Sequence, residues 1–334
     1  MNPLFPIFER FGNRFAAIDS CESVGGGFSG AHVWKIESRS GSFAVRRWPS
    51  DAAPARIHAL HRLLRHVASQ DVPVPVPLPD RHGETLFPHG GRWWQVEPWL
   101  PGRADFRVFR SDARLSAAMK TLASFHRAAE SFVSAVDDAD WFGGPNFGPA
   151  PALRDREALL LRRVIGGERT RLAQFVPARP NGEFAELARR SLCVFERVGE
   201  SVFAEVRRAG SIAVPLTPCL RDLWHDHVLF TGDEVSGLID PAACRRDTVA
   251  TDLSRLLGSL LGDDFSRWDR AIQEYSRHRP LSPGEISLVP VLDRSGLLLS
   301  AATWLRRRYL FHQPCETPEV IARLHETVTR LERL

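Results

Sequence analysis

Hydrophobic positions follow different periods in different parts of this chain. Between residues 20 and 48, short apolar stretches alternate with glycine-rich or serine-rich turns, which predicts strands. In the stretch 43–48, a period of two puts Phe43 and Val45 on one face of a strand and Ala44 and Arg46 on the other. Apolar residues at 57, 60, 64 and 67 then repeat at helical spacing and predict one amphipathic helix.

Strands are expected again at 85–87 and 93–97, after a proline-rich connection. The run 98–102, with two prolines and a glycine, breaks the pattern and is a candidate hinge. Beyond residue 102 helical spacing dominates, first in a helix that ends near His126. Two helical stretches follow at about 153–175 and 182–209, then a β-rich segment at 220–240, and the remainder is again helical.

This order predicts an α+β chain with two parts. Residues 1–100 would form an antiparallel sheet of five or so strands with one helix, and residues 101–334 a mainly helical body containing the 220–240 hairpin. A chain of 334 residues, 43% of them hydrophobic, is large enough for two lobes around a cleft.

Charge and cysteine content exclude several classes of protein. The net charge is +4 and no block of basic residues forms a nucleic-acid stripe. No uninterrupted apolar stretch approaches membrane-spanning length, and the first ten residues have no signal-peptide core. Five scattered cysteines argue against disulfides or a zinc ribbon. We therefore expect a cytoplasmic protein without nucleic-acid or membrane partners.

The richest chemistry lies between residues 219 and 240. Asp222 and Asp240 each stand where an apolar strand meets a loop, and a predicted hairpin joins them. This arrangement brings both carboxylates to one place. Phosphoryl transfer uses such a pair, because one acid orients or deprotonates the attacking hydroxyl while the other holds Mg²⁺ on the phosphates.

This stretch resembles the catalytic loop of the aminoglycoside phosphotransferase and choline kinase group of small-molecule kinases. Arg221-Asp222 matches the family's H-G-D or H-R-D loop, His227 stands where the family has asparagine, and Ile239-Asp240 matches the metal-binding strand. Further resemblances occur in chain order, at the glycine-rich run 25–30, the strand 43–46 and the helix 122–126. The resemblance extends over roughly residues 20 to 310.

The resemblance implies a two-lobed protein-kinase-like fold that binds ATP with Mg²⁺ or Mn²⁺ between its lobes. The catalytic residues would be Asp222 and Arg221, and the metal ligands Asp240 and His227. The nucleotide would contact residues of the glycine-rich loop, the following strand and the hinge, namely Gly25, Gly26, Gly27, Ser29, Gly30, Ala44, Arg46 and Glu97. The γ-phosphoryl group would move to a hydroxyl of a small molecule.

Several family positions are substituted in this chain. Arg46 replaces the family's lysine, and the helix at 55–68 offers no glutamate to hold it. Leu220 replaces the loop histidine, and Pro241 follows the metal-binding aspartate. The histidine at position 227 leaves three alternatives open. Either the second metal is lost, or Mn²⁺-like chemistry is favoured, or the imidazole of His227 donates a hydrogen bond to phosphate.

Two other functions compete with an active kinase. His225 and His227 would share one face of a strand, so a metallohydrolase site with His126 is one alternative. The substitutions also fit a degenerate pseudokinase that binds nucleotide or a partner without catalysis. Retention of both aspartates opposes this alternative, because two neighbouring carboxylates repel each other when no metal is present. A polycationic aminoglycoside is not specially indicated as the acceptor over a sugar, an amino alcohol or a homoserine-like molecule.

Overall fold

The computed structural model describes residues 4–24, 30–135 and 141–334. Contacts divide the chain into two compact units whose segments alternate along the sequence. The first unit comprises residues 1–144, 222–245 and 274–279, and the second comprises residues 145–221, 246–273 and 280–334. The expected boundary between lobes at residue 100 stays a prediction.

An antiparallel five-stranded sheet with the order β1-β2-β3-β5-β4 dominates the first unit. Its strands are β1 (Ile18–Val24), β2 (His32–Ser38), β3 (Gly41–Arg47), β4 (Phe87–His89) and β5 (Arg92–Pro98). Four of them agree with the predicted strands, whereas β4 shares only Phe87 with the strand expected at 85–87. In the register of β3 and β5, Ala44 lies opposite Glu97 and Arg46 lies opposite Gln95. These four side chains therefore belong to one face of the sheet.

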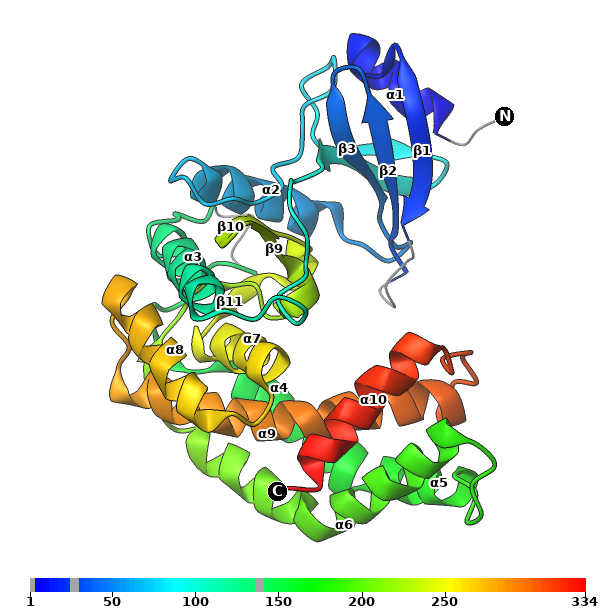
Figure 1. Ribbon diagram of the computed structural model, residues 1–334, viewed down its shortest axis with the longest axis vertical. Helices are drawn as coiled ribbons and strands as arrows, with labels where there is room; N and C mark the ends of the chain where they lie inside the picture. Colours follow the sequence, from blue (N-terminus) through cyan, green and yellow to red (C-terminus); the bar gives the residue numbers. More distant parts are fainter. Residues whose placement is uncertain (1–3, 25–29, 136–140) are drawn as a thin grey trace. The chain divides into compact units, whose positions relative to one another are not determined.

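The other face of the sheet is covered by an N-terminal helix that is not among the expected elements. Helix α1 (Phe5–Phe11) and the 3-10 turn η1 (Gly12–Phe15) lie against strands β1 to β3 (Figure 1). Ile7, Phe8 and Phe11 pack with Phe43 and Val45 in one apolar core. The predicted alternation along β3 is thus confirmed, with the apolar face buried under α1.

The remaining elements of the first unit are α2 (Pro54–Ala68), α3 (Asp112–Glu130), η4 (His225–His227), β9 (Val228–Thr231), β10 (Glu234–Leu238) and η5 (Pro241–Ala243). Helix α3 contacts both α2 and β10. The predicted hairpin is present as β9 and β10. The main chains of Arg103 and Phe230 exchange two hydrogen bonds of 2.9 Å, which join the connection after β5 to this hairpin.

Gly102, at the end of the predicted hinge, has a backbone conformation that requires glycine. Its φ is +98°, and an added Cβ would lie 2.6 Å from the carbonyl oxygen of Phe230. The close approach explains why the chain has glycine at this position.

The second unit is mainly helical. Its helical segments are α4 (Pro151–Leu160), η3 (Leu161–Ile165), α5 (Gly167–Phe175), α6 (Glu183–Ala209), α7 (Ala250–Leu261), α8 (Phe265–His278), α9 (Pro283–Leu305), η6 (Arg306–Leu310) and α10 (Pro318–Leu331). Short strands pair as β6 (Phe147–Pro149) with β7 (Ala213–Pro215) and as β8 (Thr217–Cys219) with β11 (Arg245–Asp247). The last turn of α8 and the first residue of β11 belong to the first unit.

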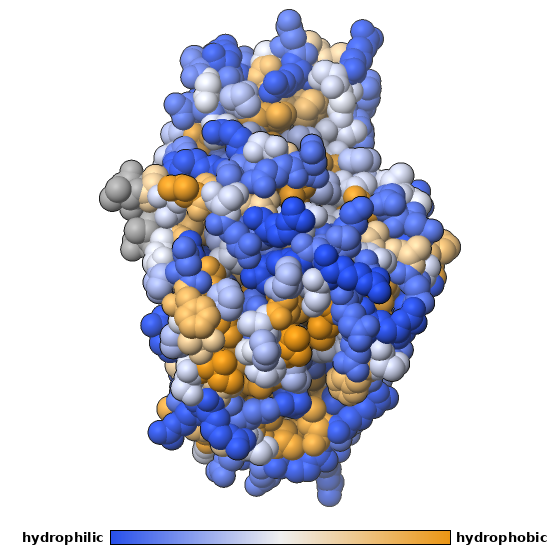
Figure 2. Space-filling view, turned by 90° about the vertical axis from the view of Figure 1, so that its left-hand side faces the viewer, coloured by the Kyte–Doolittle hydropathy of each residue, from blue (hydrophilic) through white to orange (hydrophobic). Residues whose placement is uncertain are grey.

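Helix α9 with the turn that follows it, Pro283–Leu310, is long and apolar enough to cross a membrane by length and composition. Half of its most apolar window is buried, and α9 contacts α4, α6, α7 and α10. On the face shown in Figure 2, hydrophilic residues predominate and hydrophobic residues form separate groups. The contacts of α9 with four other helices are those of a core helix. The expected absence of a membrane partner stays a prediction.

Candidate functional site

The imidazole of His227 connects the two aspartates that the sequence singled out. Its Nδ1 lies 2.9 Å from the carbonyl oxygen of Asp222, and its Nε2 lies 3.9 Å from Oδ2 of Asp240. The backbone N–H of Ile239 also donates to the carbonyl of His227. The short turn η4 therefore holds the loop of Asp222 beside the segment that presents Asp240, as the hairpin predicts.

Both ring nitrogens of His227 are engaged. The indole N–H of Trp224 donates to Nε2 over 2.8 Å, so Nδ1 must carry the proton that is donated to Asp222. A metal ion at Nε2 would have to displace the bond from Trp224. The role of His227 as a second metal ligand stays a prediction, and its role in orienting the Asp222 loop follows from the geometry.

Asp240 occupies the left-handed region of backbone space, with φ of 54° and ψ of 57°. This conformation is rare for residues other than glycine, and the next residue, Pro241, begins η5. The carboxylate is 42% exposed, and its Oδ1 lies 3.1 Å from Nη1 of Arg46. Oxygen ligands suit Mg²⁺ or Mn²⁺, so this accessible carboxylate fits the predicted metal.

Arg46 is buried between two carboxylates. Besides Asp240, its Nη2 lies 3.6 Å from Oε1 of Glu97. Its Nε is buried and has no hydrogen-bond acceptor among the described residues. Both carboxylates raise the pKa of Arg46, against the lowering effect of burial. A cation with an unused donor fits a phosphate oxygen, as the resemblance implies for this position.

The predicted nucleotide contacts are described only in part. Gly25, Gly26, Gly27 and Ser29 lie outside the described residues. Gly30 is exposed, with φ of +77°. Ala44 is buried on the same face of the sheet as Arg46, opposite Glu97.

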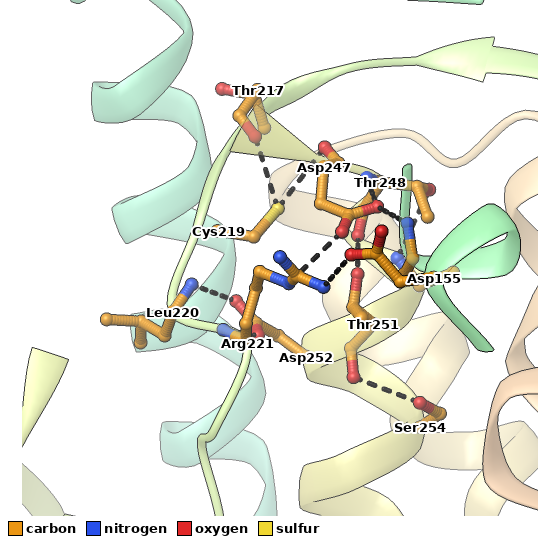
Figure 3. A network of polar contacts seen from close by, with 12 residues as sticks. Asp155, Thr217, Cys219, Leu220, Arg221, Asp247, Thr248, Thr251, Asp252 and Ser254 are labelled. Carbon is orange, nitrogen blue, oxygen red and sulfur yellow. Dashed lines mark hydrogen bonds and ion pairs between the residues drawn. The ribbon is translucent and has the colours of Figure 1, made fainter. Parts of the chain in front are cut away.

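The guanidinium of Arg221, the residue before Asp222, points into a network of the second unit (Figure 3). Its Nε lies 3.2 Å from Oδ2 of Asp247, and its Nη2 lies 3.2 Å from Oδ2 of Asp155. Asp247 is fully buried, and burial raises its pKa to about 6 even though Arg221 opposes the rise. Arg221 thus anchors the loop that carries Asp222 through its side chain. Its predicted catalytic role stays a prediction.

Asp252, near the start of α7, bonds the loop before Asp222. Its carboxylate accepts from the backbone N–H groups of Leu220 and Arg221, over 2.7 and 2.6 Å. Helix α7 begins after Val249 and has no side-chain cap. Asp252 is fully buried and fixes the backbone of the loop just before Asp222, as Figure 3 shows for Leu220. No local sequence pattern indicates this pairing, because it joins α7 to a loop that lies far away along the chain.

The metallohydrolase alternative loses its geometric basis. His225 and His227 lie in the 3-10 turn η4 rather than in a strand, so the shared face of a strand does not exist. Nε2 of His225 lies 3.3 Å from Oδ1 of Asp226. His126 is buried in α3, and its Nδ1 bonds the hydroxyl of Tyr275 over 2.7 Å. This bond gives His126 a structural role in α3.

Comparisons with known sequences identify the family of this chain. The sequence model of the phosphotransferase enzyme family matches residues 20–282. A homoserine kinase of Methylobacterium nodulans is 27% identical over 273 residues, which are 79% of this chain and 73% of that protein. A homoserine kinase of Allorhizobium ampelinum is 27% identical over 282 residues, 76% of this chain and 77% of that protein.

Solved structures show the same fold at low identity. An amicoumacin kinase in complex with AMP-PNP, Ca²⁺ and Ami has a TM-score of 0.64 at 12% identity, covering 98% of this chain and 95% of its own. A spectinomycin phosphotransferase in complex with ADP and spectinomycin has a TM-score of 0.62 at 13% identity, covering 95% and 94%. The predicted protein-kinase-like α+β fold is confirmed.

Proposed function

Because the chain belongs to the phosphotransferase enzyme family, we propose that it transfers the γ-phosphoryl group of ATP to a hydroxyl of a small molecule. One observation carries this proposal. His227 contacts the main chain of Asp222 and approaches the carboxylate of Asp240, so the acceptor-orienting acid and the metal-holding acid lie at one site. Catalysis would then consist mainly of positioning and electrostatic stabilisation.

Each side chain has a distinct part in this proposal. A divalent metal held by Asp240 would neutralise charge on the phosphates. Arg46 would donate to phosphate oxygens, including through the Nε that has no acceptor among the described residues. Asp222 would accept a hydrogen bond from the acceptor hydroxyl, or take its proton. His227 holds its loop on one side, and on the other side the loop's backbone N–H groups donate to Asp252.

We propose a small hydroxylated amino acid or amino alcohol as the acceptor. Homoserine kinases are similar to this chain over about three quarters of its length, which supports an acceptor of that size. The sequence gives no separate indication of a polycationic acceptor.

The proposal is tested by measuring ATP consumption with Mg²⁺ or Mn²⁺ against a panel of hydroxyl compounds. The panel contains L-homoserine, amino alcohols, sugars and aminoglycosides. We expect turnover with at least one small amino acid or amino alcohol, and loss of that turnover in Asp240→Ala. The matched control is Glu234→Gln, which removes an exposed charge from the same hairpin.

The pseudokinase alternative makes a different prediction in the same assay. A pseudokinase would show no turnover with any acceptor, but nucleotide binding would still raise the melting temperature of the folded protein. Family membership and the accessible Asp240 favour the active enzyme.

A further inference from the structure

A connected row of buried polar side chains lies on the sheet face that carries Arg46. Its members are His61 of α2, Gln95 and Glu97 of β5, and Arg46 itself, and all are less than one tenth exposed. Polar groups buried in this way are costly unless each one finds a partner. These side chains therefore form a buried hydrogen-bonded network and are not part of the protein surface.

The hydrogen bonds in this row have a defined direction. Trp48 has only an N–H to offer, and it donates to Oε1 of Gln95 over 2.8 Å. Nε2 of Gln95 is then the donor to Oε2 of Glu97, at 2.5 Å. Nε2 of His61 lies 3.0 Å from the same Oε1 and must donate to it, so its Nδ1 accepts from Thr85 over 2.9 Å. Burial lowers the pKa of His61 to about 4, which agrees with this neutral form.

Glu97 is thereby fixed beside Arg46, and this matters because α2 cannot supply an acid. The sequence of α2, Pro54–Ala68, contains no aspartate or glutamate. His61, the buried polar side chain of α2, bonds Gln95 rather than Arg46. The carboxylate beside Arg46 comes instead from strand β5, through the pairing that places Glu97 opposite Ala44.

Arg46 is shared between Glu97 and Asp240. Nη2 faces Glu97 at 3.6 Å, and Nη1 faces Asp240 at 3.1 Å. Without Glu97, the cation would be neutralised by Asp240 alone. An Asp240 carboxylate held entirely by arginine is a weaker ligand for a divalent cation, and the loss of one nearby negative charge weakens cation binding further.

We propose that Glu97 is a positioning residue that holds Arg46 in place of a helix glutamate and so leaves Asp240 available to the metal, with Gln95 and His61 fixing Glu97. This inference rests on the proposed function. Strand β5 thus supplies the acid that α2 lacks. This role of Glu97 differs from the nucleotide contact that the resemblance implies for it.

The test measures Mn²⁺ affinity by electron paramagnetic resonance in the presence of ADP, together with kcat for the best acceptor of the panel. We expect Glu97→Gln, which keeps the shape and the contact with Gln95, to weaken Mn²⁺ binding about tenfold. The control Glu22→Gln removes an exposed acid from β1 of the same sheet and should leave Mn²⁺ affinity unchanged. The variant Gln95→Leu should lower kcat, but it should add nothing in the Glu97→Gln background.

Each result has a definite meaning. Unchanged Mn²⁺ affinity in a folded Glu97→Gln protein would overturn the inference, whether or not Gln95→Leu folds. Additive losses of kcat in the double variant would also overturn it, since Gln95 would then act independently of Glu97. Absence of turnover in the wild type with every acceptor would contradict the proposed function instead. The Mn²⁺ titration would still decide whether Glu97 holds Arg46 or only contacts the nucleotide.

Discussion

Nε of Arg221 lies 3.2 Å from Oδ2 of the fully buried Asp247, although Arg221 itself has a φ of 64°. The residue immediately before Asp222 thus combines a strained backbone with a buried ion pair. Leu220 cannot make the hydrogen bond of the histidine that the family has in this loop. The ion pair, together with the two backbone bonds to Asp252, holds the loop by other means.

This anchor predicts the effects of substituting Arg221. Arg221→Ala leaves Asp247 buried without its cation and should reduce the free energy of unfolding by about 2–4 kcal/mol. Arg221→Gly loses the same ion pair but adopts positive φ freely, so it should be about 1 kcal/mol more stable than Arg221→Ala. Denaturant unfolding measures both values. Arg245→Ala, at an exposed arginine nearby, is the control, and equal stability of Arg221→Ala and Arg245→Ala would refute the anchor.

Two buried groups should give opposite pH dependences in the same acidic range. Burial raises the pKa of Asp247 to about 6, so the folded state binds this proton more tightly, and the stability contributed by Asp247 falls as pH rises from about 4 to 6. Burial lowers the pKa of His61 to about 4 from its ordinary value of 6.5. The unfolded chain then binds that proton more tightly, and the stability contributed by His61 falls as pH drops from 6.5 to 4.

Single variants separate the two effects. Relative to wild type, we expect the unfolding free energy of His61→Gln to rise as pH falls through this range. Relative to wild type, the unfolding free energy of Asp247→Asn should fall as pH falls through the same range. Each of the two differences should change by about 2–3 kcal/mol. Chemical denaturation at a series of pH values measures these differences. Parallel curves for wild type and both variants would contradict the assigned burial of the two groups.

Gly102 and Gly90 provide a matched pair for backbone strain. Both have positive φ, but an added Cβ at Gly90 meets nothing within 4 Å, whereas one at Gly102 would lie 2.2 Å from Oγ of Ser236. Gly90→Ala should therefore cost only about 1 kcal/mol, and Gly102→Ala clearly more, because the connection after β5 must move from the hairpin. Similar melting temperatures for the two variants would show that the Gly102 contact is not constrained.

Local periodicity was sufficient to predict most of the strands and helices. The alternation of Phe43 and Val45 with Ala44 and Arg46 depends only on neighbouring residues, and the structure confirms it. Helix α1 was missed although its signal was present, since Leu4, Ile7, Phe8 and Phe11 repeat at helical spacing and are buried. The end of α3 was placed near His126, whereas the helix continues to Glu130.

The site was predictable only where it follows from spacing along the chain. The hairpin that brings Asp222 and Asp240 together is such a feature. The ion pairs of Arg46 with Glu97 and of Arg221 with Asp247 join separate elements, and no periodic pattern specifies them. The sequence did reveal that α2 has no acid, but only the register of β3 with β5 identifies Glu97 as the replacement.

The central claim is that a phosphoryl group moves from ATP to a hydroxyl that Asp222 orients. The most direct test follows the γ-phosphoryl label of ATP into the best acceptor of the panel, for wild type, Asp222→Asn and the control Glu234→Gln. We predict labelled acceptor with wild type and control, and a rate about 10² to 10⁴-fold lower with Asp222→Asn at unchanged melting temperature. Equal labelling by Asp222→Asn, or label that never leaves the bound nucleotide in the wild type, would contradict the account.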